Sequence, residues 1–337
     1  MKFIDFFSGI GGFHSGFEKA GIKCIGWCEF DKFAQKSYRA MYDTERLWFS
    51  DDVRKARGWE LPKADIWTFG FPCQDVSVAG KQKGIKRGTR SGLFFEIMRL
   101  LDECEDNKPE WLVCENVKNL LSIDRGRGMF TVLSEMDKRG YDAEWKVYNS
   151  KNYGVPQNRE RVYIVGYLRG KCTREVLPIP RENRATLKKI IDGVQSERVY
   201  DVRGVSCTLS ANGGGMGAKT GLYMPIPLKN DTKIKVVGKL PTGGQRGIVY
   251  SENGNVGCLS ATQYKDPSKI LSKNGIRKLT PKECWRLQGF TDEQFDKAQA
   301  VNNNTQLYKQ AGNAVTVNVA YEIGKHIAKK ENEKVDR

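Results

Sequence analysis

The stretch MKFIDFFSGIGGF, residues 1–13, decides how the chain is interpreted. Its apolar run KFIDFF predicts a strand, and Gly9, Gly11 and Gly12 follow directly, before a segment with helical spacing. Glycines at such a turn let the backbone bend sharply and approach a ligand closely. The spacing is not G-x-G-x-x-G, because His14 stands where the third glycine would be. We therefore favour a nucleoside ligand over a dinucleotide with its pyrophosphate.

The alternation of strand and helix continues to about residue 170. Apolar runs that predict strands occupy residues 23–29, 64–71, 110–117, 143–150 and 161–167. Apolar residues at helical spacing occupy residues 14–21, 31–42, 92–104 and 128–140. This order predicts an α/β fold, a Rossmann-like and mostly parallel sheet with helices on both faces. Active sites of such sheets gather at the carboxyl ends of the strands.

The composition changes after Gly170. Residues 174–276 are rich in Gly, Ser, Thr, Lys and Pro, which predicts a smaller, irregular, β-rich domain. From residue 277 the chain becomes helical again, with Thr280 as the expected N-cap and Pro281 at the first helical position. We therefore expect the chain to divide into three parts: an α/β part at residues 1–173, a β-rich domain at residues 174–276, and a helical part at residues 277–337.

The net charge is the strongest signal in the composition. The chain carries 56 Lys+Arg against 40 Asp+Glu, a formal charge of +16. Residues 171–278 hold 19 Lys+Arg and 8 Asp+Glu, so this region supplies +11 of the +16. A basic excess in one region favours a polyanionic partner, most simply nucleic acid, although a solubilising surface remains an alternative.

The remaining composition argues against several classes of protein. No run approaches the length of a membrane span, and the early Asp5 is atypical of a signal peptide. The 9 cysteines have no framework spacing, which favours a reducing cytoplasm. With only His14 and His326 available, we expect no structural metal, although Cys24 and Cys28 are four residues apart.

One cysteine differs from the others in its surroundings. Cys73, in the segment Gly70-Phe71-Pro72-Cys73-Gln74, comes just after a predicted strand and precedes the basic, glycine-rich stretch 80–92. Nearby positive charge favours the thiolate, which is the nucleophilic form. A free cysteine is more often a small buried apolar residue, and that is our expectation for the other eight.

Polar residues at other strand ends point to the same crevice. Glu29 ends the second predicted strand, a usual place for a carboxylate that binds ribose hydroxyls, and Asp52 could accept from an adenine amino group. Glu115 ends an apolar strand and could act as an acid, although a cap or a salt bridge is an equal alternative. Arg159 and Arg161 alternate at a strand start, where they could bind carbonyl oxygens or phosphates.

Together these motifs resemble those of the DNA (cytosine-5) methyltransferases, in the compact form found in bacterial and phage restriction–modification. The motifs occur in family order as DFFSGIGGF, GFPCQ, ENV, QNRER, RKLTPKECWRLQGF and QLYKQAGNAV. They cover residues 1–170 and 277–320 and leave the middle region unmatched. One departure is Ala314 in GNAV, where many members of the family have serine.

The resemblance implies S-adenosylmethionine as methyl donor, no metal, and a cytosine flipped out of duplex DNA as substrate. Cys73 would attack ring carbon 6, Glu115 would donate to nitrogen 3, Arg161 would bind the carbonyl oxygen, and Arg159 would order the pocket. The residues implied to hold the cofactor are Phe7, Gly9, Gly12, Glu29, Phe30, Asp52, Val53 and Asn313. Those implied to meet the DNA are Phe71, Pro72, Gln74, Ser77, Arg90, Asn116, Gln157 and Thr208.

The resemblance also implies a division of labour along the chain. Residues 1–173 would begin the catalytic domain, residues 174–276 would recognise the target sequence, and residues 277–337 would return to the catalytic domain. We expect a cytoplasmic monomer, of host or phage origin, with a possible cognate endonuclease. Three other readings remain: a methyltransferase acting on tRNA, an inactive DNA-binding regulator, and a nicotinamide oxidoreductase. The target sequence itself is not readable from the chain.

Overall fold

The computed structural model describes residues 1–72, 91–155, 157–170, 176–177 and 280–335, with short strands between 189 and 278. The chain divides into two compact units, which are described separately below. Unit 1 comprises Met1–Tyr148, Glu160–Pro180 and Val315–Arg337, and unit 2 comprises Asn149–Arg159 and Arg181–Ala314. The functional division at residues 173 and 276 stays a prediction.

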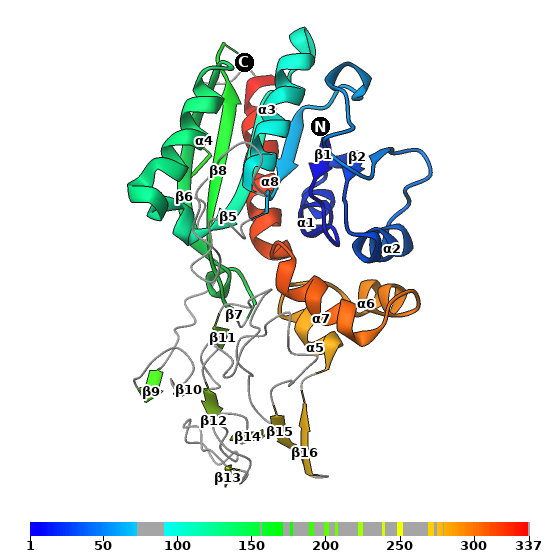
Figure 1. The fold of residues 1–337 in the computed structure, drawn as a ribbon, viewed down its shortest axis with the longest axis vertical. Coiled ribbons are helices and arrows are strands. Elements are labelled where there is room, and N and C mark those ends of the chain that lie inside the picture. The colour runs from blue at the N-terminus through cyan, green and yellow to red at the C-terminus, as the bar shows by residue number, and fades with distance from the viewer. Residues whose placement is uncertain are drawn as a thin grey trace. The chain divides into compact units, whose positions relative to one another are not determined.

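Unit 1 is built on one sheet with helices around it (Figure 1). Its strands are β1 (Lys2–Phe6), β2 (Lys23–Cys28), β3 (Trp48–Ser50), β4 (Ile66–Phe69), β5 (Trp111–Val117), β6 (Tyr141–Asn149) and β8 (Glu160–Leu168). Its α-helices are α1 (Gly12–Lys19), α2 (Lys32–Met41), α3 (Phe94–Glu103), α4 (Arg127–Asp137) and α8 (Val317–Val335). Its 3₁₀ turns are η1 (Gly58–Glu60), η2 (Ser91–Leu93), η3 (Glu105–Asn107), η4 (Lys118–Leu121) and η5 (Ile123–Gly126).

The sheet has seven strands in the order β3-β2-β1-β4-β5-β8-β6. Strands β3, β2, β1, β4 and β5 pair in parallel, whereas β8 pairs antiparallel with β5. The predicted Rossmann-like, mostly parallel α/β fold is therefore confirmed. The strand order reverses between β1 and β4, and ligands of such sheets bind at this point, beyond the carboxyl ends of the strands.

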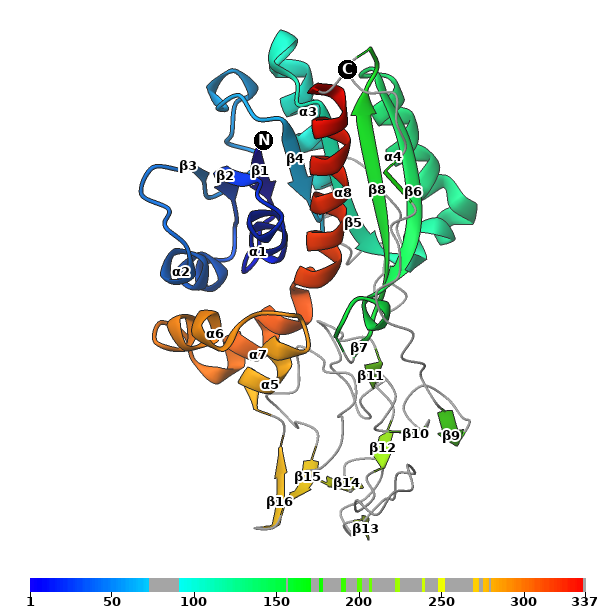
Figure 2. The same cartoon turned by 180° about the vertical axis from the view of Figure 1, so that it is seen from behind.

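The two faces of the sheet bury alternate residues of each strand. Ile4 and Phe6 of β1 pack on one face in a core that also contains Ile97 of α3 and Val132 of α4. Phe3, which points to the opposite face, packs against Phe17 of α1 with ring centroids 5.3 Å apart. The two views show α8 on that same face, with α3 and α4 across the sheet (Figures 1 and 2). Burial on both faces explains why the strands read as apolar runs.

Two glycines of α1 bring the first and last helices of unit 1 into close contact. A Cβ at Gly12 would lie 2.2 Å from the Val315 carbonyl oxygen. A Cβ at Gly16 would lie 2.6 Å from Ala320 Cβ and 2.7 Å from both the Val317 oxygen and the Tyr321 nitrogen. Helix α8 therefore packs against the backbone of α1, which fixes the start of α1 where the glycine turn ends.

In the described residues of unit 2, short strands are accompanied by three α-helices. The elements are η6 (Ser150–Asn152), β7 (Gln157–Asn158), β9 (Lys189–Ile191), β10 (Val199–Asp201), β11 (Ser206–Cys207), β12 (Leu222–Met224), β13 (Gly238–Lys239), β14 (Ile248–Ser251), β15 (Lys269–Ser272), β16 (Gly275–Lys278), α5 (Pro281–Arg286), α6 (Asp292–Gln299) and α7 (Asn304–Asn313). The strands form small sheets in the orders β12-β10-β9, β11-β7 and β13-β14-β15-β16.

Helix α5 of unit 2 begins as the sequence predicts. Thr280 caps α5 in a capping box with Glu283, and Pro281 occupies the first turn. The Trp285 indole nitrogen donates to the Leu307 oxygen at 3.0 Å, which ties α5 to α7. Across the described ranges of both units, no helix combines the length and the apolar character that crossing a membrane requires.

Candidate active site

The glycine turn between β1 and α1 has a strained backbone. Phe7 has a backbone φ of 53° and Gly9 one of 56°. Both lie in the left-handed region, which residues other than glycine rarely adopt. A Cβ built on Gly9 would meet no atom within 4 Å, so the space beside this residue is open. Gly12, by contrast, faces Val315. Of the two glycines predicted to hold a cofactor, Gly9 offers its backbone to a ligand, and Gly12 explains the helix packing.

Glu29 fastens the end of β2 to this turn. Its Oε2 accepts from the Gly9 backbone nitrogen at 2.7 Å, and its Oε1 accepts from the Asp31 nitrogen at 2.7 Å. Burial of the carboxyl group raises the pKa of Glu29 above its ordinary value. Next to it, the Phe30 side chain is 70% exposed, which leaves an aromatic face beside the turn. The structure thus brings Glu29 to Gly9, and Phe30 follows Glu29 in the chain.

Asp52 and Val53 follow β3, the next strand along the sheet. The Arg54 guanidinium forms a two-pronged ion pair with Asp52, with its Nε 2.9 Å from Oδ1 and its Nη2 2.6 Å from Oδ2. These hydrogen bonds lower the pKa of Asp52, so the carboxylate is ionised at neutral pH. Val53 is buried. Asp52 therefore presents acceptor oxygens only, as recognition of an amino group requires.

A second group of polar side chains lies at the ends of β4 and β5. Arg161 of β8 is paired in register with Val117, and its Nε lies 3.0 Å from Glu115 Oε1. Both side chains are largely buried, with 13% and 11% of their surfaces exposed. A Cβ at Gly70 would lie 3.5 Å from Glu115 Oε2. The acid of the predicted ENV motif therefore lies directly beside the segment that leads to Cys73.

Asn116 holds that segment in place. Its Nδ2 donates to the Phe71 oxygen at 3.1 Å, and its Oδ1 accepts from the Val117 nitrogen at 2.9 Å. Asn116 and Phe71 are both buried, each 2% exposed. The structure thus brings together Phe71, Glu115, Asn116 and Arg161. Pro72 is the last described residue of this segment. The predicted residues Cys73, Gln74, Ser77, Arg90 and Thr208 lie outside the described residues.

Gln157 and Arg159 belong to unit 2, where each contacts the end of a helix. Arg159 is 3% exposed and donates to the Gly312 oxygen at 3.2 Å and the Ala314 oxygen at 2.8 Å. Gln157 is fully buried and donates to the Leu287 oxygen at 2.8 Å. These contacts order α5 and α7 within unit 2. Asn313, the last residue of α7, is exposed.

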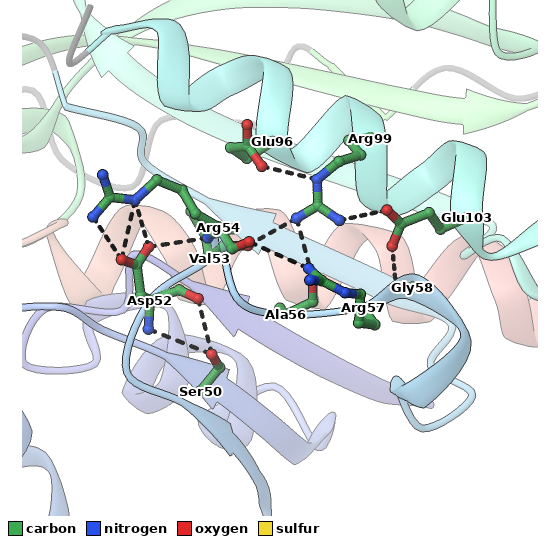
Figure 3. A network of polar contacts seen from close by, with 10 residues as sticks. All are labelled: Ser50, Asp52, Val53, Arg54, Ala56, Arg57, Gly58, Glu96, Arg99 and Glu103. Carbon is green, nitrogen blue, oxygen red and sulfur yellow. Dashed lines mark hydrogen bonds and ion pairs between the residues drawn. The ribbon is translucent and has the colours of Figure 1, made fainter. Parts of the chain in front are cut away.

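The sequence did not reveal two side chains that hold backbone segments in place. One fixes the glycine turn after β1, and the other fixes the segment that follows β3. The Tyr42 hydroxyl donates toward the Ile10 and Gly11 carbonyl oxygens, at 3.1 and 3.0 Å, and so clamps the glycine turn. Arg99 of α3 donates to the Val53 and Ala56 oxygens, each at 3.1 Å (Figure 3). The spacing of Glu96, Arg99 and Glu103 signals ion pairs on a helix but carries no sign of these distant carbonyls.

The described cysteines behave as the sequence predicts for packing residues. Cys24, Cys28, Cys104, Cys114 and Cys284 are buried. Burial raises the pKa of Cys24 to about 12 and that of Cys104 to about 11, so both stay protonated at neutral pH. Within the described part of the chain, no group of His, Cys, Asp and Glu is arranged to hold a metal ion.

Comparison with known proteins identifies the class. The family model for C-5 cytosine-specific DNA methylase matches residues 1–329. The chain belongs to this family and is an enzyme, a DNA (cytosine-5) methyltransferase. The predicted family resemblance is thereby confirmed.

Individual relatives agree with this assignment. The type II methyltransferase M1.ScrFI of Lactococcus lactis subsp. cremoris is 34% identical over 329 residues, covering 96% of this chain and 76% of its own. The type II methyltransferase M.NlaX of Neisseria lactamica is 33% identical, covering 97% and 96% of the two chains. Among solved structures, the Entamoeba histolytica methyltransferase EhMeth superposes with a TM-score of 0.66 at 16% identity, covering 98% of each chain, a likeness of fold.

Proposed function

We propose that this enzyme transfers a methyl group from S-adenosylmethionine to carbon 5 of a cytosine flipped out of a specific duplex DNA sequence. The observation that carries the proposal is the Glu115–Arg161 pair, because Glu115 lies beside Gly70 at the carboxyl end of β4 and the next residue, Asn116, binds the Phe71 oxygen. Pro72 alone separates Phe71 from Cys73 along the chain, so the sequence leads from this pair directly to the thiol of the family motif.

The residues around the glycine turn fit the proposed cofactor. Gly9 leaves open space where a side chain would otherwise stand, and the exposed Phe30 supplies an aromatic face for adenine. Glu29 accepts backbone hydrogen bonds on both oxygens and retains lone pairs for ribose hydroxyls. Phe7, Asp52 and Val53 would enclose the adenine, and Gly12 and Asn313 complete the implied set. When bound, the cofactor supplies an electrophilic methyl group on a sulfonium.

The protein residues would prepare the cytosine for that methyl group. Extruding the base costs about a few kcal/mol, which contacts to the flipped base offset. Addition of the Cys73 thiolate to carbon 6 places negative charge on the ring, and makes carbon 5 nucleophilic. Glu115 would donate a proton to nitrogen 3, and Arg161 would bind the carbonyl oxygen, so both stabilise that charge. Once carbon 5 has taken the methyl group, its proton would be lost to water, the carbon 5–carbon 6 double bond would re-form with Cys73 leaving as thiolate, and the nitrogen 3 proton would return to Glu115. Arg159 would order the pocket, as the family resemblance implies.

Other parts of the chain would bind and select the DNA. The basic region 171–278 would approach the phosphates, and Thr208 belongs to the part that would choose the target. Phe71, Pro72, Asn116 and Gln157 would shape the pocket, and Gln74, Ser77 and Arg90 would meet the DNA beside it. We further propose a monomer that protects DNA in a restriction–modification or phage setting, with a possible cognate endonuclease.

Trapping with a fluorinated substrate tests the covalent step. A duplex carrying 5-fluorocytosine cannot lose a proton from carbon 5, so the adduct to Cys73 should persist after methyl transfer. The wild-type protein, incubated with such duplexes and S-adenosylmethionine, should give a band that resists denaturation on a gel, and Cys73→Ser should give none. A Cys73→Ser protein that forms the same band would contradict the proposed nucleophile.

A further inference from the structure

The segment that carries Asp52 and Val53 rests on α3 (Figure 3). A Cβ at Gly58 would lie 2.5 Å from both the Leu100 oxygen and Glu103 Cβ, so the chain here touches the helix backbone. The Gly58 nitrogen donates to Glu103 Oε2 at 2.7 Å. Residues 53–58 are thus docked on one helix at their far end.

Arg99 holds the near end of the same segment. Its Nη2 donates to both the Val53 and Ala56 oxygens at 3.1 Å, and its Nη1 lies 2.5 Å from Glu103 Oε1. Its Nε donates to Glu96 Oε2 at 2.8 Å, which orients the guanidinium. One planar group therefore spans two backbone carbonyls and two carboxylates, a geometry that a lysine ammonium cannot reproduce.

We infer that Arg99 is a positioning residue for the adenine half of the cofactor. It acts through the chain itself: it fixes the backbone of Val53 and, one residue before it, the place of Asp52. This inference rests on the proposed use of S-adenosylmethionine. Its consequence is specific: a looser segment should weaken binding of the adenosine moiety and leave the chemical step unchanged.

The test compares Arg99→Lys with a matched arginine. Arg139 also contacts α3, through the Met98 oxygen at 3.0 Å and Asp102 at 2.6 Å, but it contacts no residue of the segment 52–58 among its described partners. Arg139→Lys therefore perturbs α3 without disturbing Val53. Glu103→Gln weakens the same contacts by a second route, since Glu103 binds both Gly58 and Arg99.

Calorimetric titration of the full chain with S-adenosylhomocysteine, and separately with adenosine, measures the effect. Arg99→Lys should bind both ligands about tenfold more weakly, the size expected when hydrogen bonds from a charged donor are lost. Glu103→Gln should show the same direction, and Arg139→Lys should bind like the wild type. In methylation assays, KM for S-adenosylmethionine should rise, while kcat and KM for DNA stay unchanged.

The possible outcomes separate this inference from the proposed function. Wild-type protein that binds neither ligand overturns both together. If the wild type binds the ligands and Arg99→Lys and Glu103→Gln bind them with the same affinity, only the positioning role is overturned. A loss of affinity for S-adenosylhomocysteine that is absent with adenosine, or one shared by Arg139→Lys, overturns it as well, since the effect would not be confined to the adenine end.

Discussion

Replacing Gly16 with alanine tests the contact between the first and last helices of unit 1. In an open helix position this change would stabilise the fold by about 1 kcal/mol, because alanine is the better helix former. Here the new methyl group would lie 2.6 Å from Ala320 Cβ and 2.7 Å from two backbone atoms of α8. Carbon atoms in good contact are about 3.5–4.0 Å apart, so α1 and α8 must separate by about 1 Å.

Moving α1 away from α8 should destabilise the fold by more free energy than the better helix propensity of alanine contributes. Overpacking of this kind typically costs about 1–3 kcal/mol, and contacts with backbone place it at the upper end. We therefore expect a net loss of about 2 kcal/mol. For a domain of this size, that corresponds to a fall in melting temperature of about 4–8 °C.

Thermal unfolding followed by circular dichroism measures the change. The double variant Gly16→Ala with Ala320→Gly removes one of the clashing carbons, so the two substitutions should be less destabilising together than the sum of their separate effects. A Gly16→Ala protein that melts at or above the wild-type temperature would refute the close packing of α1 on α8.

Three further predictions concern buried charge. Burial raises the pKa of Asp5 to about 8 from its ordinary 3.8, so the folded protein keeps a proton that the unfolded chain releases, and stability falls as pH rises from about 4 to 8. The melting temperature of Asp5→Asn should therefore rise relative to that of the wild type as the pH increases from about 5 to 8.5. A difference between the two melting temperatures that stays constant with pH would contradict this. Arg159→Met should lower the melting temperature through the lost hydrogen bonds to Gly312 and Ala314, each worth about 1.5–3 kcal/mol, and unchanged melting would count against them. Arg161→Met should lower kcat at least about 100-fold with little change in KM for S-adenosylmethionine, since it would remove a contact to the developing charge, whereas a rise in that KM alone would argue for a cofactor role.

The sequence predicted the central strands well because β1, β2, β4 and β5 are buried along most of their length. The runs around β1, β2, β4 and β5 are continuous apolar stretches, and their polar ends marked Glu29 and Glu115. The sequence did not predict that β8 lies between β5 and β6, because strand order depends on contacts that no local pattern encodes.

The contacts that shape the candidate site were equally beyond reach. Arg99 reaches carbonyl oxygens more than forty positions away, and backbone acceptors leave no trace in the sequence. Gly12 was interpreted as a ligand-binding glycine because it follows a strand, but its missing side chain also makes room for Val315. Family motifs located the candidate residues. Only the three-dimensional contacts distinguish Gly9, which has open space beside it, from Gly12, which packs against Val315.

Chemical analysis of methylated DNA tests the central claim most directly. The purified protein is incubated with DNA of varied sequence and isotopically labelled S-adenosylmethionine, and the DNA is digested to nucleosides for mass spectrometry. Labelled 5-methyldeoxycytidine should appear with the wild type and disappear with Cys73→Ser. Labelled N4-methyldeoxycytidine or N6-methyldeoxyadenosine in its place, or label transferred only to tRNA in a parallel reaction, would contradict the assigned reaction.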